Sequence, residues 1–159
     1  MPPITAFLHT KNDRLRLGRT LETLLPCAEI LIVDHQSTDG TLRIAREYGA
    51  RVLSGESAGA NEYLRLARHD WIFCIAPGES MTEGLQASLF DWSVLDGGEV
   101  EQRAFSLLVR EQIGESWHAL PAPQVRLVPR NWAGWTGRFP APDSMAIQLE
   151  GELLRFTLP

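Results

Sequence analysis

The chain has 159 residues, of which 44% are hydrophobic and 22% charged, a balance typical of one globular domain with a substantial core. A formal net charge of −5 argues against a general nucleic-acid binder, because binding to phosphates requires a basic face. No apolar run reaches the roughly 18 residues of a membrane span, and the stretch MPPITAFLHTK lacks the features of a secretory signal, so we expect a cytoplasmic protein.

Strand-like and helix-like segments alternate over the first 92 residues. Short apolar runs rich in β-branched residues predict strands, and apolar residues at helical spacing predict helices. The continuous apolar run EILIVD is typical of a strand covered on both faces, as in a parallel sheet. The expected strands are 4–10, 29–34, 50–54 and 70–76. The expected helices are 14–25, a segment that follows the polar turn STDG and ends before Gly49, 58–68 and 80–92.

The two outer helices of this series carry specific expectations. In the first, Leu17, Leu21, Leu24 and Leu25 lie at helical spacing before Pro26. In the last, either Ser80 or Thr82 is expected as the N-cap, because a hydroxyl satisfies free amide groups there. Its inward residues should be Leu85, Leu89 and Phe90. The alternation as a whole predicts a doubly wound α/β fold with a parallel sheet.

The pattern changes after the acidic, glycine-rich connector LDGGEVEQ. The remaining segments are β-like and separated by Pro and Gly, with no long helical pattern. We expect them to add antiparallel strands to one edge of the sheet, and a flap over it. These segments are 103–111, 123–130, 144–151 and 153–159.

Ligands of an open parallel sheet bind beyond the carboxyl ends of its strands. That rule selects the loops HTKND, DHQSTDG and APGES. The second opens with Asp34, which either contacts a ligand or pins the turn by hydrogen bonds. Asp39 is expected to cap the following helix. A hydrolytic triad of Asp34, His35 and Ser37 is disfavoured, because neighbours on one turn seldom reach the required geometry.

The two cysteines give no sign of a disulfide or metal site. Cys27 and Cys74 lie far apart in the sequence, and no Cys and His pair has metal-site spacing. Cys74 lies within the apolar run WIFCIA and is expected to be a small buried hydrophobic residue.

Taken in order, ITAFLHTKND, EILIVDHQSTDGTLRIAREYGARVL and ARHDWIFCIAPGES resemble family 2 glycosyltransferases of the GT-A fold. The likeness is greatest to bacterial enzymes of lipopolysaccharide-core or cell-envelope glycan assembly, strong over 4–80 and loose beyond. The resemblance implies a three-layer α/β/α domain spanning 1–159, with a mainly parallel sheet and added antiparallel C-terminal strands. Residues 1–95 would form the nucleotide-binding half and 96–159 a β-rich acceptor-side half.

The family implies a nucleotide-diphosphate sugar as donor. By that resemblance, His9 and Lys11 would flank the nucleobase and Asp34 would hydrogen-bond its edge. A carboxylate can accept from an imide or amino N–H, so the chemistry agrees with the proposed role of Asp34.

The sequence also departs from the family. Where relatives carry Asp-X-Asp to hold Mg²⁺ or Mn²⁺, this chain has Ala76-Pro77-Gly78, which offers no side-chain oxygen to a hard cation. Glu79 alone is a poor metal site, so no divalent cofactor is expected unless Glu79 suffices. Ala60 replaces an arginine expected before Asn61. The stretch GRFPAPDS replaces a His-Glu pair, so the expected base is absent.

Two functions follow from these departures. The first is a catalytically impaired protein that keeps a nucleotide-sugar pocket. The second is an active, metal-independent glycosyltransferase in which Lys11 or an arginine of 126–138 supplies positive charge, with Glu79 or Asp143 as a weak candidate base.

The partners left open are a nucleotide or nucleotide sugar, a second copy of the chain, or another protein. Trp132 and Trp135 either pack a flap against the sheet or form a surface for a partner or a sugar.

Overall fold

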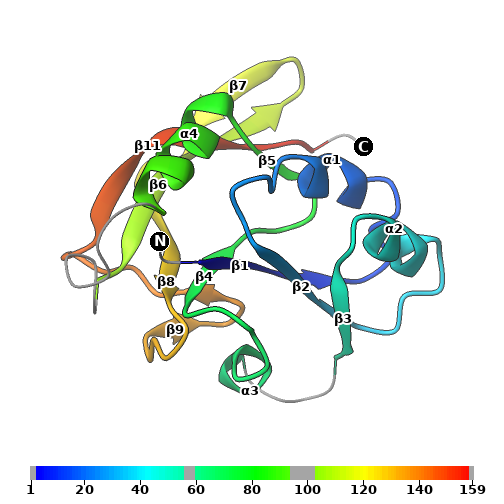
Figure 1. Cartoon of the computed structure of the whole chain (residues 1–159). Helices are drawn as coiled ribbons and strands as arrows, with labels where there is room; N and C mark the ends of the chain where they lie inside the picture. Colours follow the sequence, from blue (N-terminus) through cyan, green and yellow to red (C-terminus); the bar gives the residue numbers. More distant parts are fainter. Residues whose placement is uncertain (1–2, 56–59, 94–102, 158–159) are drawn as a thin grey trace.

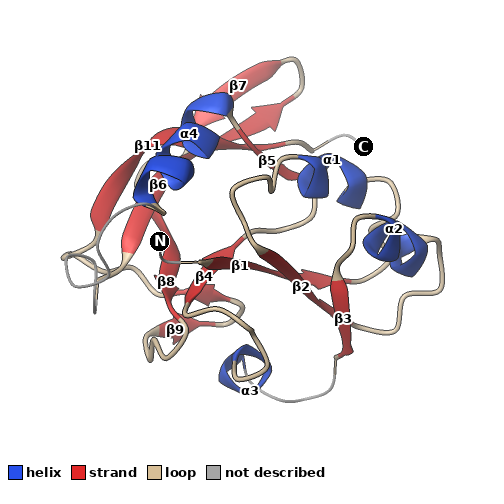
Figure 2. Ribbon diagram, viewed as in Figure 1, coloured by secondary structure: helices blue, strands red, loops and turns tan. Residues whose placement is uncertain are grey.

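The computed structural model describes residues 3–55, 60–93 and 103–157 (Figure 1). Its centre is a curled nine-stranded sheet with the order β3-β2-β1-β4-β8-β6-β11-β5, and β7 pairs with β6. The helices are short and few compared with the strands (Figure 2). The strands are β1 (Ile4–Thr10), β2 (Glu29–Asp34), β3 (Arg51–Ser54), β4 (Trp71–Cys74), β5 (Glu79–Met81), β6 (Phe105–Ile113), β7 (Ser116–Ala119), β8 (Gln124–Pro129), β9 (Trp135–Thr136), β10 (Phe139–Pro140) and β11 (Ile147–Arg155). The helices are α1 (Leu17–Glu22), α2 (Thr41–Glu47), α3 (Ala60–Leu64) and α4 (Glu83–Trp92).

The N-terminal half forms the parallel part of the sheet. β1 pairs in parallel with β2 and with β4, and β2 pairs in parallel with β3. The expected strands of this half are therefore confirmed. Because the strands are parallel, the loops that follow β1, β2 and β4 all open at the same edge of the sheet.

The C-terminal half extends the sheet beyond β4. β8 is antiparallel to β4 and β6 is antiparallel to β8, as expected. β11 pairs antiparallel with β5, as expected, but it runs parallel to β6, which was not expected. The segments 144–151 and 153–159 were expected to be separate, but β11 continues through both. The register of β11 shifts between Gln148 and Glu152, so Gly151 lies in an irregularity within one strand rather than in a turn.

The helices are shorter than the sequence patterns predict. α1 ends at Glu22, so Leu25 lies beyond the helix and its side chain is 71% exposed. Phe90 is 48% exposed and was wrongly expected inside, because the buried residues of α4 are Leu85, Leu89 and Trp92. The N-cap is Thr82, whose hydroxyl accepts a hydrogen bond from the Leu85 N–H, whereas Ser80 lies in β5.

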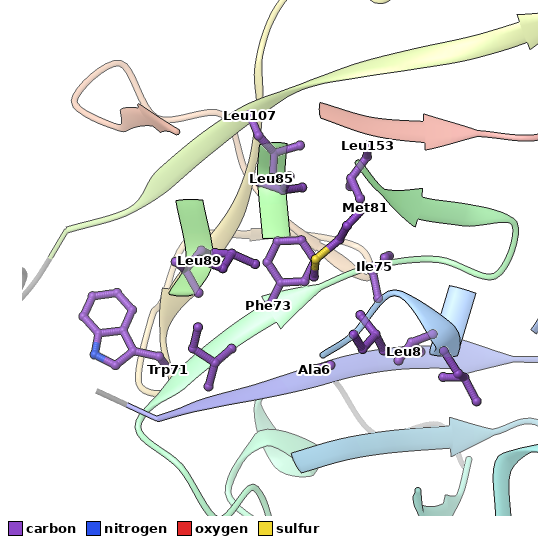
Figure 3. Packing of buried hydrophobic residues seen from close by; sticks show 14 of the residues in the cluster. Ala6, Leu8, Trp71, Phe73, Ile75, Met81, Leu85, Leu89, Leu107 and Leu153 are labelled. Carbon is purple, nitrogen blue, oxygen red and sulfur yellow. The ribbon is translucent and has the colours of Figure 1, made fainter. Parts of the chain in front are cut away.

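Side chains that alternate along β1 divide the core between the two faces of the sheet. Ile4, Ala6 and Leu8 belong to a cluster with buried residues of α1, α2 and α4. Phe7 belongs to a second cluster with Tyr63 and other residues of the α3 side. Figure 3 shows the first cluster, where Phe73 of β4 lies close to Met81 and Leu89.

A small two-stranded sheet of β9 and β10 forms the expected flap. Trp132, Trp135 and Phe139 are half-buried and pack against the second core cluster. The Trp135 indole N–H donates to the carbonyl of Trp132 at 2.7 Å. These contacts favour the packing role of both tryptophans over a free binding surface.

Both cysteines are free thiols, and Cys74 is buried as expected. Among the described residues, no helix combines the length and apolar character needed to cross a membrane. The expected connector at 95–102, and with it the boundary between the two halves of the chain, falls outside the described residues.

Candidate functional site

A cavity of about 170 Å³ lies where the parallel strands end. His9 and Phe7 of β1 contribute one wall, and Ala76 and Pro77 beyond β4 contribute another. This is the edge at which open α/β sheets bind their ligands. Among the described residues, the lining consists of Phe7, His9, Asp13, Ile75, Ala76, Pro77, Arg138 and Phe139.

The loops after β1 and β2 are joined to each other by hydrogen bonds. The N–H of Asn12 donates to the Ser37 hydroxyl at 2.9 Å, and the N–H of Thr38 donates to Asn12 Oδ1 at 2.8 Å. Asn12 and Gln36 have positive φ angles of 51° and 60°. Non-glycine residues rarely adopt this conformation, and they keep it where the surroundings hold the backbone in place. The two loops therefore form a fixed rim.

Asp34, the last residue of β2, is hydrogen-bonded to the end of β1 and to the loop after β2 but is not among the described residues that line the cavity. Its carboxylate, in a residue only 6% exposed, accepts hydrogen bonds from the Thr10 hydroxyl at 2.7 Å and from the hydroxyl and N–H of Ser37 at 2.6 and 3.0 Å. Burial alone would raise the pKa of Asp34, but the bonds from Ser37 and Thr10 outweigh it and lower the pKa. Because a carboxylate has about four lone-pair sites, one acceptor position is left. The nucleobase contact of Asp34 stays a prediction.

The two other predicted nucleotide-binding residues differ in position. His9 lines the cavity, whereas Lys11 is exposed and its Nζ donates to the Gln36 carbonyl at 3.1 Å. His9 Nδ1 lies 2.9 Å from Nε2 of His35, a contact that the sequence did not predict. Burial, the charge of Arg138 and the charge of His35 lower the pKa of His9 to about 4, so its imidazole is neutral at neutral pH.

Asp39 and Ser37 have local roles. Gly40 occupies the N-cap of α2, and Asp39, one residue earlier, accepts the Thr41 N–H at 2.9 Å, which serves the capping purpose predicted for it. Ser37 bonds to Asp34 directly, and the ring of His35 bonds to His9. No hydrolytic triad is formed by Asp34, His35 and Ser37.

Beyond β4 the chain makes a tight turn instead of a metal-binding motif. The Glu79 N–H donates to the Ala76 carbonyl at 3.0 Å, with Pro77 and Gly78 in the central positions and Gly78 at a φ of +92°. These are the features of a type II turn, in which glycine tolerates the positive φ. Gly78 N–H donates to the Thr20 hydroxyl at 2.9 Å, so α1 holds the turn from one side.

Glu79 is buried beneath this turn and does not line the cavity. Its two carboxylate oxygens accept from Arg126 at 2.8 Å each, and Arg155 donates at 3.1 Å. It also accepts the Ala76 N–H at 2.8 Å. Burial alone would raise the pKa of Glu79, but Arg126, the Ala76 N–H and Arg155 together lower it. This geometry gives Glu79 a structural role, and its candidacy as a base stays an untested prediction.

The residues at this edge do not fit a divalent cation. Ala76 lines the cavity and has no oxygen in its side chain, and the oxygens of Glu79 face arginines. Asp13 is the one carboxylate among the described lining residues, and its Oδ2 accepts the Lys11 N–H. Across the described ranges 3–55, 60–93 and 103–157, no group of three or more His, Cys, Asp or Glu residues could hold a metal ion. Mg²⁺ and Mn²⁺ need several oxygen ligands.

Two further sequence expectations lie apart from the cavity. Asp143 is half-buried, accepts the Met145 N–H at 2.8 Å and is not among the lining residues. The other concerns Ala60, which stands in place of the arginine expected before Asn61. The side chains of both residues lie outside the part of the chain that the structure describes.

The three arginines of the segment 126–138 have different environments. Arg126 is 1% exposed and is paired with Glu79. Arg130 donates to the Ala67 carbonyl at 2.7 Å and to Asp70 at 3.3 Å. Arg138 is exposed and lines the cavity. The sequence identified the segment but not the member that reaches the site, because that depends on how the β9–β10 hairpin folds back.

Comparison with known proteins gives a consistent picture. Residues 5–76 match the family described as Glycosyl transferase family 2. An uncharacterized glycosyltransferase of Rickettsia felis is 33% identical over 94 residues, which cover 54% of this chain and 32% of that protein. The lipopolysaccharide core biosynthesis glycosyltransferase LpsC of Rhizobium meliloti is 46% identical over 46 residues, covering 29% of this chain and 17% of that protein. The chain thus spans about a third or less of the length of these curated relatives.

Solved structures show the same fold. S. aureus TarS 1–349 in complex with UDP-GlcNAc superposes with a TM-score of 0.54 at 19% identity, over 76% of this chain and 37% of that one. Mannosyl-3-phosphoglycerate synthase from Rubrobacter xylanophilus gives a TM-score of 0.53 at 21% identity, over 69% of this chain and 41% of that one. These likenesses confirm the expected α/β fold of the GT-A type.

Proposed function

The chain is related to the family 2 glycosyltransferases and has their GT-A fold, and on that premise we propose that it is a nucleotide-sugar-binding domain that works without a divalent cation and is impaired in sugar transfer. The single observation that carries this proposal is the chemistry of the cavity wall. Ala76, at the position expected to hold a metal ligand, lines the cavity and has no side-chain oxygen.

Three features support nucleotide-sugar binding. The cavity lies at the carboxyl ends of parallel strands, and its rim is fixed by hydrogen bonds between the loops after β1 and β2. The ionised carboxylate of Asp34 keeps one acceptor position. The structural relative TarS was solved with UDP and with UDP-GlcNAc, which makes uridine nucleotides the first ligands to try.

The proposed impairment of sugar transfer follows from the lack of a bound cation to stabilise the departing diphosphate. Loss of a nucleoside diphosphate leaves negative charge on the departing phosphates, and a bound cation normally stabilises it. The candidate bases lie away from the cavity: Glu79 is held by arginines and Asp143 by a local turn. We also propose that residues 1–159 form one domain of this fold, since strands from both halves join one sheet.

The alternative function is an active, metal-independent glycosyltransferase in envelope glycan synthesis. One observation favours it: Arg138 places a positive charge at the cavity. Hydrolysis of a donor sugar in the absence of metal, lost in Lys11→Ala or Arg138→Gln, would support this alternative. Absence of turnover alongside measurable binding supports the impaired protein.

The experiment that tests the proposed function is a thermal-shift panel. UDP-, GDP-, CMP- and dTDP-sugars are added with EDTA or with Mn²⁺. We expect at least one nucleotide sugar to raise the melting temperature equally in both conditions, because ligand binding stabilises the folded state whatever the metal. Stabilisation that requires Mn²⁺ would contradict the argument from the missing oxygen ligands. No stabilisation by any nucleotide sugar would contradict the binding function itself.

A second experiment separates the two roles of Asp34. Asp34→Ala should abolish binding of the nucleotide sugar found in the panel if the carboxylate contacts the base. Ser37→Ala is the control, since it removes a donor to Asp34 and keeps the carboxylate. Equal loss of affinity in both variants would show that Asp34 acts only by holding the turn.

A further inference from the structure

We propose that Arg138 binds the diphosphate of the nucleotide sugar and provides the positive charge at the place where related enzymes use a metal ion. This inference rests on the proposed function and deepens it, because it assigns a residue of this chain to the phosphate groups. Four observations about the position, availability and charge of Arg138 support it.

The position of Arg138 is the first observation. The residue lies in the turn between β9 and β10 and lines the same cavity as Ala76 and Pro77, the residues at the expected metal motif. The cavity is therefore bounded on one side by a wall without oxygen ligands and on another by a guanidinium group.

The hairpin that carries Arg138 is anchored. Its neighbour Phe139 also lines the cavity, and the ring of Phe139 covers the guanidinium of Arg126 at 4.4 Å. Arg126 is held in turn by Glu79 beneath the Ala76-Pro77-Gly78 turn. The buried Arg126–Glu79 pair thus contacts both the turn that carries Ala76 and the hairpin that carries Arg138.

Availability distinguishes Arg138 from the two other arginines of the segment 126–138 and from Lys11. Arg126 and Arg130 are paired with Glu79 and Asp70, and Lys11 donates to the Gln36 carbonyl. Within the described parts of the chain, no carboxylate forms an ion pair with Arg138. Its donors are therefore available to an anion.

The charge of Arg138 also reaches the cavity interior. It is a cause of the lowered pKa of both His9 and His35, which means that its guanidinium acts electrostatically on the imidazole of His9 in β1 and on that of His35 after β2. The opposing charge at the cavity is Asp13, whose Oδ2 is already engaged by the Lys11 N–H.

A guanidinium suits this role chemically. Its planar fork of N–H donors matches phosphate oxygens, often through two parallel bonds, and it stays charged at all relevant pH values. It carries one positive charge where Mn²⁺ carries two, so by Coulomb's law it stabilises a departing diphosphate less at equal distance. The single charge of Arg138 would then explain both the binding of the nucleotide sugar without metal and the weak or absent transfer of the sugar.

Isothermal titration calorimetry in EDTA tests the inference. The probes are UDP, GDP, CDP and dTDP, each compared with its nucleoside, and the variants are Arg138→Gln, Arg138→Lys and the control Arg46→Gln. Arg46 is an exposed arginine in the last turn of α2, so the control removes the same charge elsewhere. Each variant is first checked for an unchanged melting temperature, which is expected because Arg138 is exposed.

We expect Arg138→Gln to weaken binding of the diphosphate about tenfold or more and to leave nucleoside binding unchanged, the effect typical of a lost charge-assisted hydrogen bond. Arg138→Lys should lie between wild type and Arg138→Gln, and Arg46→Gln should match wild type. Raising the salt concentration should weaken diphosphate binding to wild type more than to Arg138→Gln.

The outcomes separate the two proposals. If wild type and Arg138→Gln bind the diphosphate equally, the assignment of Arg138 is overturned and the binding function stands. Equal weakening of nucleoside and diphosphate would also overturn it, since Arg138 would then serve the base or the fold. If wild type binds none of the four diphosphates, both proposals fall.

Discussion

The guanidinium of Arg126 donates to both carboxylate oxygens of Glu79, with N···O distances of 2.8 Å, and each side chain is only 1% exposed. The pair connects β8 with β5, whose residues are far apart in the sequence. It also fixes the turn after β4, because Glu79 accepts the Ala76 N–H. The carboxylate nearest the expected metal motif is thus used to hold the fold.

Removing this carboxylate should destabilise the protein. In Glu79→Ala, Arg126 is left buried without its partner, and we expect the free energy of unfolding to fall by about 3–5 kcal/mol. Glu111→Ala is a matched control, since Glu111 lies 3.8 Å from Arg155 in a more exposed pair, which should contribute about 1 kcal/mol or less. Urea unfolding monitored by circular dichroism measures both. Equal effects of the two substitutions would contradict the structural role of Glu79.

The same pair predicts a pH dependence, which completes the first prediction. Because the folded protein lowers the pKa of Glu79, its contribution to stability is present above the ordinary glutamate pKa of about 4.3 and is lost as the pH falls through the lower folded value. Urea unfolding of Glu79→Gln at a series of acidic pH values should show a shallower loss of stability than wild type. A parallel loss in both proteins would rule out this contribution.

The imidazoles of His9 and His35 respond to the charge of Arg138. Burial, Arg138 and His35 lower the pKa of His9 to about 4, so protonation of His9 costs stability as the pH falls from about 6.5 to about 4. Arg138→Gln removes a positive charge, and we expect the pKa values of His9 and His35 to rise. That of His9 should stay below 6.5, because burial remains its largest cause.

Histidine ring resonances followed by NMR over this pH range measure both pKa values without any ligand. Arg46→Gln is again the control and should leave them unchanged. If the pKa of His9 is the same in wild type and Arg138→Gln, then the guanidinium of Arg138 does not act on the cavity in solution.

A carboxylate returned to the cavity wall should weaken nucleotide binding. Ala76 lies on the cavity, so in Ala76→Asp a negative charge faces both Arg138 and the bound diphosphate. Without metal, we expect diphosphate affinity to fall about tenfold, the effect of one unfavourable interaction of about 1.4 kcal/mol. Ala76→Asn, which has nearly the same shape and no charge, is the control in the same calorimetric assay. Unchanged affinity in Ala76→Asp would place the phosphates away from this wall.

Gly151 should tolerate no side chain. Its φ is +95°, and an added Cβ would overlap the backbone of Leu85 at the start of α4. We expect Gly151→Ala to cost about 2–5 kcal/mol, from a positive φ of about 1–2 kcal/mol and overpacking of about 1–3 kcal/mol. Gly114→Ala is the control, because Gly114 has a φ of +62° with open space around it and should cost only the backbone term. Chemical denaturation compares the two, and equal costs would show that α4 shifts to make room.

Much of the fold could be predicted from the sequence. Alternating strand and helix patterns identified β1 to β4, because each apolar run has a local signature that does not depend on distant partners. The sequence patterns gave wrong predictions where the outcome depends on contacts between distant segments. Phe90 is apolar and one residue from a buried position, yet its side chain lies outside the buried stripe of α4. The direction of β11 beside β6 also has no local signature.

By itself, the sequence determined that the side chains at positions 76 and 78 have no oxygen and cannot ligate a hard cation in any fold. The tertiary structure alone decided which charged side chains lie at the cavity. The sequence alone does not distinguish Arg126, Arg130 and Arg138. In the folded protein Arg126 is buried against Glu79, Arg130 pairs with Asp70, and Arg138 lines the cavity. Charge interactions depend on distance and burial, and these are set only when segments far apart in the chain meet.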